Sequence, residues 1–182
     1  RNNLGVVLRS LGDYAQALEV YQAILRDQNY SLNHLKVVLK SREGYKTTLE
    51  VEGGCADDEE QIYDLKSDSP LLILKIWYNL AGVHRALGNY KKALSIYQEV
   101  YSLQEKVLGK GHEDSLMTRH SIATVLQYLE RHQEALEIYQ EIVSLKEEAL
   151  GPKHPSTLRT RHNLAGALKD TGRLEEALRE LR

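Results

Sequence analysis

The 182-residue chain contains one cysteine, three prolines, one methionine, one tryptophan and no phenylalanine. Cys55 alone excludes an internal disulfide, and a chain of this size without disulfides fits a reducing compartment, so we expect an intracellular, cytoplasmic protein. The longest apolar run, residues 71–78, is interrupted by Lys75 and is far shorter than the roughly 20 residues of a membrane-spanning helix. A net charge of −2 excludes a nucleic-acid-binding footprint spread over the whole chain.

One unit of sequence recurs at a fixed distance. NLAGVHRALGNYKKALSIYQEVYSLQEKVLG begins at Asn79, SIATVLQYLERHQEALEIYQEIVSLKEEALG at Ser121 and NLAGALKDTGRLEEALREL at Asn163, so these copies are 42 residues apart. A fourth copy, NLGVVLRSLGDYAQALEVYQAIL, begins at Asn3. Repeats of this period predict a stacked solenoid, whose usual function is to offer an extended binding surface and not a catalytic pocket.

Apolar residues at three- and four-residue spacing predict two amphipathic helices in each unit. A glycine ends the first helix in three of the units, at Gly12, Gly88 and Gly172. One position of the second helix is alanine in every copy, at Ala17, Ala93, Ala135 and Ala177. One position of the first helix also holds a small residue in every copy, at Gly5, Ala81, Ala123 and Ala165. Because small side chains let two helix axes approach closely, each unit is predicted to be a helical hairpin.

The joins between units are equally regular. Gly109 and Gly151 follow the second helix, and Asp114 or Ser156 then stands where we expect the N-cap of the next first helix. The prolines lie at expected helix starts or in joins, at Pro70, Pro152 and Pro155. The third unit has Glu130 where the turn glycine belongs and His132 in place of a tyrosine, so we expect its hairpin to be less tightly made.

These units resemble tetratricopeptide repeats of the long, 42-residue type found in kinesin light chains. The resemblance rests on the Gly88, Tyr90, Ala93, Tyr97 series, on Trp77, and on the phrase LG-x-x-H-P-x-T-L-x-T-R-x-N-L-A from Leu150 to Ala165. It covers residues 1–28 and 69–182. It implies an all-α, right-handed superhelical solenoid of antiparallel helix hairpins, with four clear repeats and one degenerate repeat.

The chain is therefore expected to be a single solenoid domain, 1–182. Its repeats would span 1–28, 69–110, 111–152 and a truncated 153–182, so we also expect the chain to be a piece of a longer protein. Residues 29–68 are expected to form the degenerate repeat, because LKSREGYKTTLEV aligns with LRSLGDYAQALEV, and to contain an acidic loop at 52–60. The alternative is a disordered insertion throughout 29–68.

Charge separates the two helices of each unit. Stacked hairpins curl so that the first helices line the concave face. The first helices carry the basic residues Arg1, Arg9, Lys75, Arg85, Arg119, Arg159, Arg161 and Lys169, whereas the second helix at 131–150 is rich in glutamate. The concave face is therefore predicted to be positive.

The resemblance to peptide-binding tetratricopeptide domains implies a groove position occupied by an asparagine that reaches the ligand's main chain. This position holds Asn3, Asn79, Ser121 and Asn163. Its neighbours along the groove are Lys75, Met117 and Arg159; Tyr78, His120 and His162; and Arg9, Arg85, Gln127 and Lys169. We hypothesise that this face binds a protein or peptide segment carrying acidic residues. Alternatively the asparagines hydrogen-bond between adjacent repeats and the basic residues are only solvated, and both roles can coexist.

The residues that could take part in catalysis or bind a metal do not form a recognisable catalytic or cofactor site. The pairs His112 and His154, and His120 and His162, are 42 residues apart because each is one position of successive repeats, so we expect no metal. His84, on an apolar helix face, is expected to be a satisfied core residue. We therefore predict a non-enzymatic adaptor without cofactor, nucleic-acid or membrane-insertion roles. The alternatives are a structural or self-associating segment, and the sensor region of a larger signalling ATPase or effector.

Overall fold

A computed structural model describes residues 2–27 and 70–181, so the predictions for 29–68 lie outside the described residues. Within these ranges there are eight helices and no strand. They are α1 (Asn2–Ser10), α2 (Tyr14–Asp27), α4 (Pro70–Ala86), α5 (Tyr90–Leu108), α6 (Glu113–Tyr128), α7 (His132–Leu150), α8 (Pro155–Asp170) and α9 (Leu174–Glu180). None of these helices is long and apolar enough to cross a membrane.

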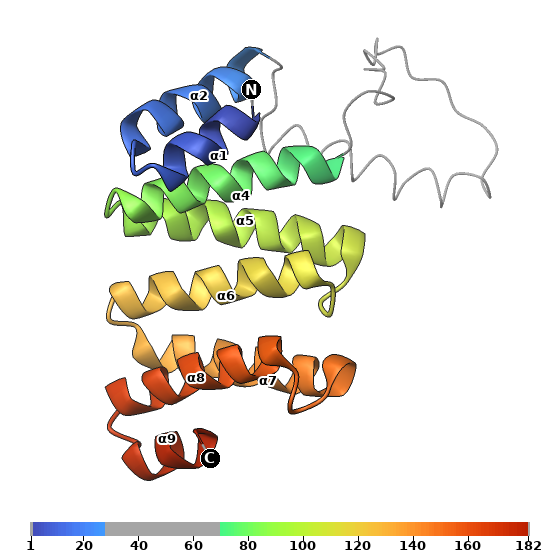
Figure 1. Cartoon of the computed structure of the whole chain (residues 1–182), viewed down its shortest axis with the longest axis vertical. Coiled ribbons are helices and arrows are strands. Elements are labelled where there is room, and N and C mark those ends of the chain that lie inside the picture. The colour runs from blue at the N-terminus through green and yellow to red at the C-terminus, as the bar shows by residue number, and fades with distance from the viewer. Residues whose placement is uncertain (1, 28–69, 182) are drawn as a thin grey trace, which may run out of the picture.

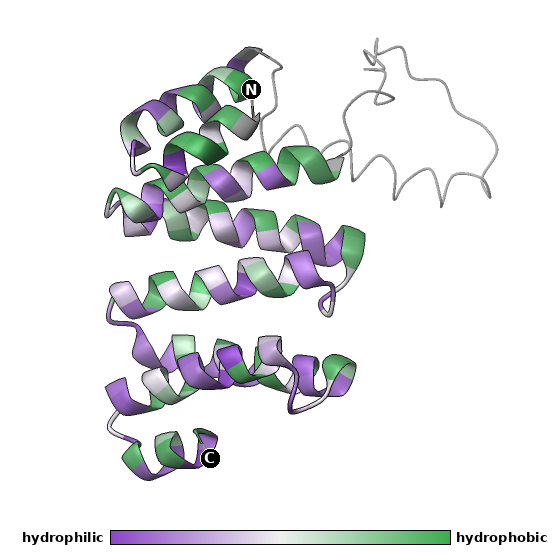
Figure 2. Ribbon diagram, in the orientation of Figure 1, coloured by the Kyte–Doolittle hydropathy of each residue, from purple (hydrophilic) through white to green (hydrophobic). Residues whose placement is uncertain are grey.

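The helices pair into four antiparallel hairpins, α1–α2, α4–α5, α6–α7 and α8–α9, which stack along the long axis of the molecule (Figure 1). Each helix packs on its hairpin partner, and α5 and α7 also pack on the first helix of the hairpin that follows. Hydrophilic and hydrophobic residues alternate around every helix, as expected of helices that each bury one face (Figure 2). The all-α solenoid predicted from the repeat is confirmed.

The small residues singled out in the sequence lie at the centre of the hairpins. Ala17, Ala93 and Ala135 are fully buried, as are Ala81 and Ala123 on the facing helices. The absence of longer side chains at these positions lets the two helices of a hairpin pack closely. The core is continuous from hairpin to hairpin because these residues belong to one cluster of buried side chains.

Three hairpin turns contain the predicted glycine in a left-handed conformation. Gly12, Gly88 and Gly172 have φ values of 82°, 76° and 78°. At Gly88 the N–H donates to the Arg85 carbonyl at 3.1 Å, and the N–H of Asn89 donates to the His84 carbonyl at 2.8 Å. This pair of bonds is a Schellman motif, in which carbonyls left over at the end of the helix are satisfied.

The expectation of a looser third hairpin is wrong. Glu130 adopts φ 60°, and its N–H donates to the Gln127 carbonyl at 3.0 Å. The N–H of Arg131 donates to the Leu126 carbonyl at 2.9 Å, as in the glycine-containing turns. The α6–α7 turn therefore keeps the same hydrogen bonds, and a residue with a side chain adopts the left-handed conformation there.

Replacing Glu130 with glycine should raise the free energy of unfolding by about 0.5 to 1 kcal/mol, because glycine adopts positive φ without steric cost. Glu130 is exposed, so the substitution removes no packing. Urea denaturation followed by circular dichroism measures the change. The matched control is Gly88→Ala. Gly88 has φ 76° and open space around it, so this substitution should lower the free energy of unfolding by a similar amount. An unchanged or lower stability of Glu130→Gly would contradict this account.

The predicted N-caps of the first helices are wrong by two residues. Asp114 and Ser156 lie inside α6 and α8, and the N-caps are His112 and His154. Their Nδ1 atoms accept hydrogen bonds from the backbone N–H of Asp114 at 3.1 Å and of Ser156 at 3.2 Å. A ring nitrogen thus does what a serine or aspartate oxygen usually does at this position. Pro155 at the start of α8 agrees with its predicted place.

Candidate functional site

The predicted groove residues all lie on the first helices of the hairpins. Asn3 lies in α1, where its side chain is outside the described part of the structure. We call the other thirteen the first-helix face: Arg9, Lys75, Tyr78, Asn79, Arg85, Met117, His120, Ser121, Gln127, Arg159, His162, Asn163 and Lys169. Each of these side chains is half-buried or exposed. They are therefore available to a ligand to differing degrees.

Hydrogen bonds connect the first-helix face across the repeats. Tyr78 Oη lies 3.1 Å from Ser121 Oγ, and the Asn163 amide donates to His120 Nε2 at 2.5 Å. Both pairs join the same two positions of successive repeats, 43 residues apart. Between the first and second hairpins, Arg9 Nη1 donates to Asn79 Oδ1 at 3.2 Å. Asn79 and Asn163 therefore bond between adjacent repeats, which was the structural alternative considered from the sequence.

A tyrosine of the second helix lies behind each of the two aromatic positions of the face. The Tyr97 ring is 5.4 Å from the Tyr78 ring, and the Tyr139 ring meets His120 edge-on at 5.4 Å. Burial raises the pKa of Tyr97 to about 12, so its hydroxyl stays protonated. The sequence did not single out these tyrosines as part of the site, although their 42-residue spacing was a usable signal.

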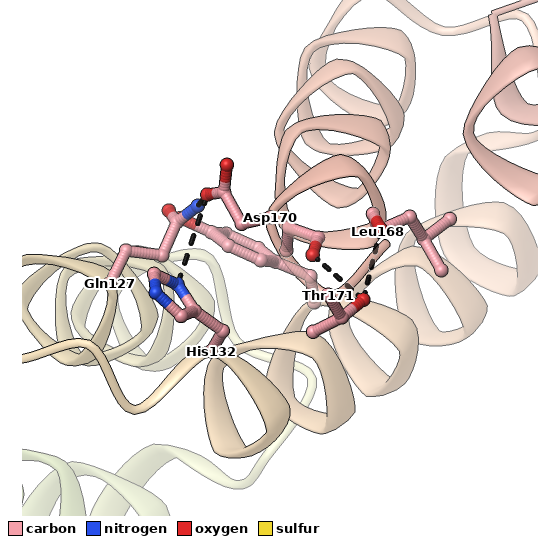
Figure 3. Close-up of polar contacts among 7 residues, drawn as sticks. Gln127, His132, Leu168, Asp170 and Thr171 are labelled. Carbon is pink, nitrogen blue, oxygen red and sulfur yellow. Dashed lines mark hydrogen bonds and ion pairs between the residues drawn. The ribbon is translucent and has the colours of Figure 1, made fainter. Parts of the chain in front are cut away.

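Polar contacts behind the face also join the third and fourth hairpins (Figure 3). Tyr139 Oη donates to Gln127 Oε1 at 3.1 Å, and Gln127 Nε2 donates to Asp170 Oδ2 at 3.3 Å. His132 Nδ1 lies 3.8 Å from the same carboxylate oxygen. Asp170 therefore places one acidic group at the edge of the face, immediately after Lys169 in the sequence.

Two of the basic residues counted toward a positive face are neutralised. Arg119 forms an ion pair with Glu141, and its guanidinium lies 4.9 Å from the centre of the Tyr101 ring. Arg161 donates to Glu147 Oε1 through Nε at 2.8 Å. Both carboxylates come from α7, so glutamates of the second helix neutralise the positive charges of these two arginines. Arg119 and Arg161 therefore do not add unpaired positive charge to the concave face, although the sequence prediction counted them among its basic residues.

The other described cations of the face have no carboxylate partner within residues 2–27 and 70–181. Arg85 and Arg159, which belong to the repeats before and after His120, both exert a positive electrostatic field on its ring. Burial of the ring, followed by the charges of Lys146, Arg159 and Arg85, lowers the pKa of His120 to about 4. The central part of the first-helix face is thus a region of positive potential that lacks a counter-charge in the described structure.

Lys146 adds a buried charge behind this region. It is 8% exposed and donates to Thr160 Oγ1 at 3.0 Å. Burial and the neighbouring Arg159 lower the pKa of Lys146. In the described ranges, no three His, Cys, Asp or Glu side chains lie close enough together to hold a metal ion. The arrangement offers hydrogen-bonding groups and cations along an open row of helices.

Comparison with known proteins agrees with this geometry. A model of the tetratricopeptide repeat family matches residues 72–148 and 117–182, and a second such model matches residues 1–28. The chain belongs to the tetratricopeptide repeat family. Tetratricopeptide repeats are stacked helical units that create extended binding surfaces, and the chain has the architecture of a scaffold for protein–protein interaction. No curated protein matches the chain.

Solved structures of tetratricopeptide proteins share this fold. One is a Podosopora anserina protein named for kinesin light chain, which consists of nearly identical TPR-like repeats. It is 22% identical in sequence to this chain, with a TM-score of 0.69. The match covers 98% of this chain and 69% of that chain. BtubC (BKLC) from P. vanneervenii is 13% identical with a TM-score of 0.56, and the match covers 95% of this chain and 71% of that chain. At these identities the likeness establishes the fold alone.

Proposed function

We propose that this chain is a cytoplasmic adaptor whose first-helix face binds a peptide segment of a partner protein, and that the segment carries acidic residues. The observation that supports this proposal is the division among the basic residues. Arg119 and Arg161 are paired with glutamates of α7, whereas Arg85 and Arg159 flank His120 without a carboxylate in the described structure. Unpaired cations concentrated on one face attract a ligand of opposite charge.

The asparagines can serve the ligand and the stack together. Asn79 accepts from Arg9 through Oδ1, and Asn163 donates to His120 through Nδ2. An asparagine amide carries two donor hydrogens and an acceptor oxygen, so each retains hydrogen-bonding capacity after this contact. An extended peptide has unpaired backbone N–H and C=O groups that match this remaining capacity. Pairing between repeats therefore orients the amides without exhausting them.

Neutralising the two unpaired arginines should weaken binding by about three- to tenfold, because each exposed charge pair contributes up to about 1 kcal/mol. Peptides are first selected from a random library on the immobilised chain and should be enriched in Asp and Glu. The dissociation constant of a selected peptide is then measured by fluorescence anisotropy with wild type and with the Arg85→Gln Arg159→Gln variant. Added salt should weaken wild-type binding, because it screens exposed charges.

The matched control is Lys106→Gln with Arg179→Gln, which removes two exposed cations outside the first-helix face. This control should bind the selected peptide as wild type does. Selection of peptides without acidic enrichment would contradict the acidic character of the ligand. Equal loss of affinity in both double variants would show that net charge, and not the first-helix face, governs binding.

A further inference from the structure

Lys146 is a buried cation behind the first-helix face. It lies in α7, is 8% exposed and donates through Nζ to Thr160 Oγ1 at 3.0 Å. Thr160 is fully buried and stands next to Arg159 in α8. Lys146 forms no ion pair with any residue of the described ranges. A charge taken out of water is unfavourable unless an opposite charge accompanies it, so this position requires an explanation.

The first and second repeats have a neutral residue at the position of Lys146. It is glutamine in both, Gln28 and Gln104. Gln104 is 3% exposed, so glutamine fits the same buried environment without carrying a charge. Packing of one hairpin on the next therefore does not require a lysine, and its presence must serve something other than the fold.

A second cation replaces a neutral residue at the same place. We call the third–fourth junction the part of the first-helix face where His120 of α6 bonds to Asn163 of α8, together with Arg159, one turn before Asn163, and Lys146 behind it. Arg159 is exposed there. At the preceding junction its position is held by Met117, and that of Lys146 by glutamine. Positive charge is thus added at the third–fourth junction both on the face and behind it.

The buried ammonium acts on the face itself. Burial lowers the pKa of the His120 ring most, and Lys146 is the charged group with the next largest effect, ahead of Arg159 and Arg85. Lys146 is therefore close enough to influence a group bound beside His120. Because protein screens charges less than water does, a buried cation attracts a neighbouring anion more strongly than an exposed cation would.

The acidic residues nearest in sequence to this junction do not neutralise it. Glu113, at the exposed start of α6, attracts the buried ammonium without forming an ion pair with it. Glu147 is paired with Arg161. Asp170 follows Arg159 by eleven residues in α8, about 16 Å further along the helix axis. In the described part of the chain, the two added cations therefore have no carboxylate partner.

We propose that the acidic side chain of a bound peptide lies at the third–fourth junction, and that Lys146 is the specificity-determining residue that selects this junction. This inference rests on the acidic-peptide function proposed above and locates the acidic residue within it. The carboxylate lies beside Arg159 and the His120 ring, where it supplies the negative charge that the buried ammonium lacks. The unfavourable burial of Lys146 in the free protein is thus offset when the peptide binds.

Nuclear magnetic resonance tests this location with N-acetyl-aspartate N-methylamide, and the corresponding asparagine derivative is the neutral match. The aspartate probe should shift the ring signals of His120 and the amide signals of residues 159–163 more than the amide signals of residues 75–79. The asparagine probe should produce smaller shifts. Larger shifts at 75–79, equal shifts from both probes, or no shift at 159–163 at tens of millimolar would overturn the location.

Substitutions of Lys146 test its role. Lys146→Gln, which installs the residue of the preceding repeat, should weaken binding of the aspartate probe about threefold or more, because it removes a charge shielded from water. The same variant should keep the midpoint of urea denaturation or move it to higher urea, because an unpaired buried charge is lost. Lys146→Arg keeps the charge and should retain most of the binding. The matched control Lys106→Gln, exposed on α5, should bind as wild type does.

The outcomes separate this inference from the function on which it rests. Loss of both binding and stability in Lys146→Gln, without rescue by Lys146→Arg, would show that Lys146 only supports the fold. An acidic peptide that binds wild type and Lys146→Gln equally would overturn the role of Lys146 and leave the acidic-peptide function intact. Selected peptides without acidic residues would overturn both.

Discussion

Lowering the pH from 6.5 to 4 should reduce the free energy of unfolding by about 3 kcal/mol through His120 alone. The folded protein holds the pKa of this ring at about 4, against 6.5 for an unperturbed histidine. Each pKa unit of difference between the folded and unfolded states corresponds to about 1.4 kcal/mol of stability. This contribution is a large share of the stability of an ordinary domain.

The sign follows from which state binds the proton first. Between pH 6.5 and 4 the unfolded chain takes up a proton on His120 that the folded chain does not. Stability is therefore complete above pH 6.5 and is lost as the pH falls toward 4. The main physical cause is burial of the ring, followed by the charges of Lys146, Arg159 and Arg85. Protonation would also place a hydrogen on Nε2, which accepts from the Asn163 amide in the folded protein.

Urea denaturation at a series of pH values measures this effect, and His120→Gln isolates it. Glutamine keeps an acceptor for Asn163 but does not titrate, so the difference in pH dependence between wild type and variant reports His120. His162→Gln is the matched control, because His162 is the same position of the next repeat and is exposed. That control should retain the pH dependence of wild type. An identical slope in His120→Gln would contradict the assignment.

Much of the fold could be predicted because each physical environment recurs with the 42-residue unit. Ala93 and Ala135 are small for one reason, close packing of two helices, and both are fully buried. The sequence misplaced the N-caps because histidine is not among the usual capping residues, although the recurrence of His112 and His154 was visible. It also misjudged Glu130, because the hydrogen bonds of the turn can impose a left-handed conformation on a residue other than glycine.

The site could be predicted only as a row of positions. Helical periodicity placed Arg85 and Arg119 on first helices, but it could not indicate that a glutamate of α7 reaches Arg119. Such pairing depends on distances between helices, which one repeat's sequence does not contain. Likewise, the sequence predicted His84 as a satisfied core residue, but its buried ring nitrogens have no hydrogen-bond partner in the described part of the chain. The sequence prediction therefore differs from the structure mainly in which side chains are paired across the hairpins.

Replacing Gly5 with alanine should lower the free energy of unfolding by about 1 to 3 kcal/mol, although the other repeats have alanine at this position. Sequence comparison and helix propensity predict the opposite sign, because alanine is favoured over glycine in a helix by about 1 kcal/mol. The structure reverses that expectation. A Cβ atom at Gly5 would lie 2.6 Å from Cζ of Tyr21, whose ring is fully buried and cannot move aside without disturbing the core.

Gly166 provides the matched control, since it also lies within a first helix but a Cβ there would meet no atom within 4 Å. Gly166→Ala should therefore leave stability unchanged or raise it by up to about 1 kcal/mol. Combining Gly5→Ala with Tyr21→Leu tests the cause, because removal of the ring also removes the clash. The double variant should be less destabilised than the sum of its two single variants. Strict additivity would show that contact with Tyr21 is not what requires glycine at position 5.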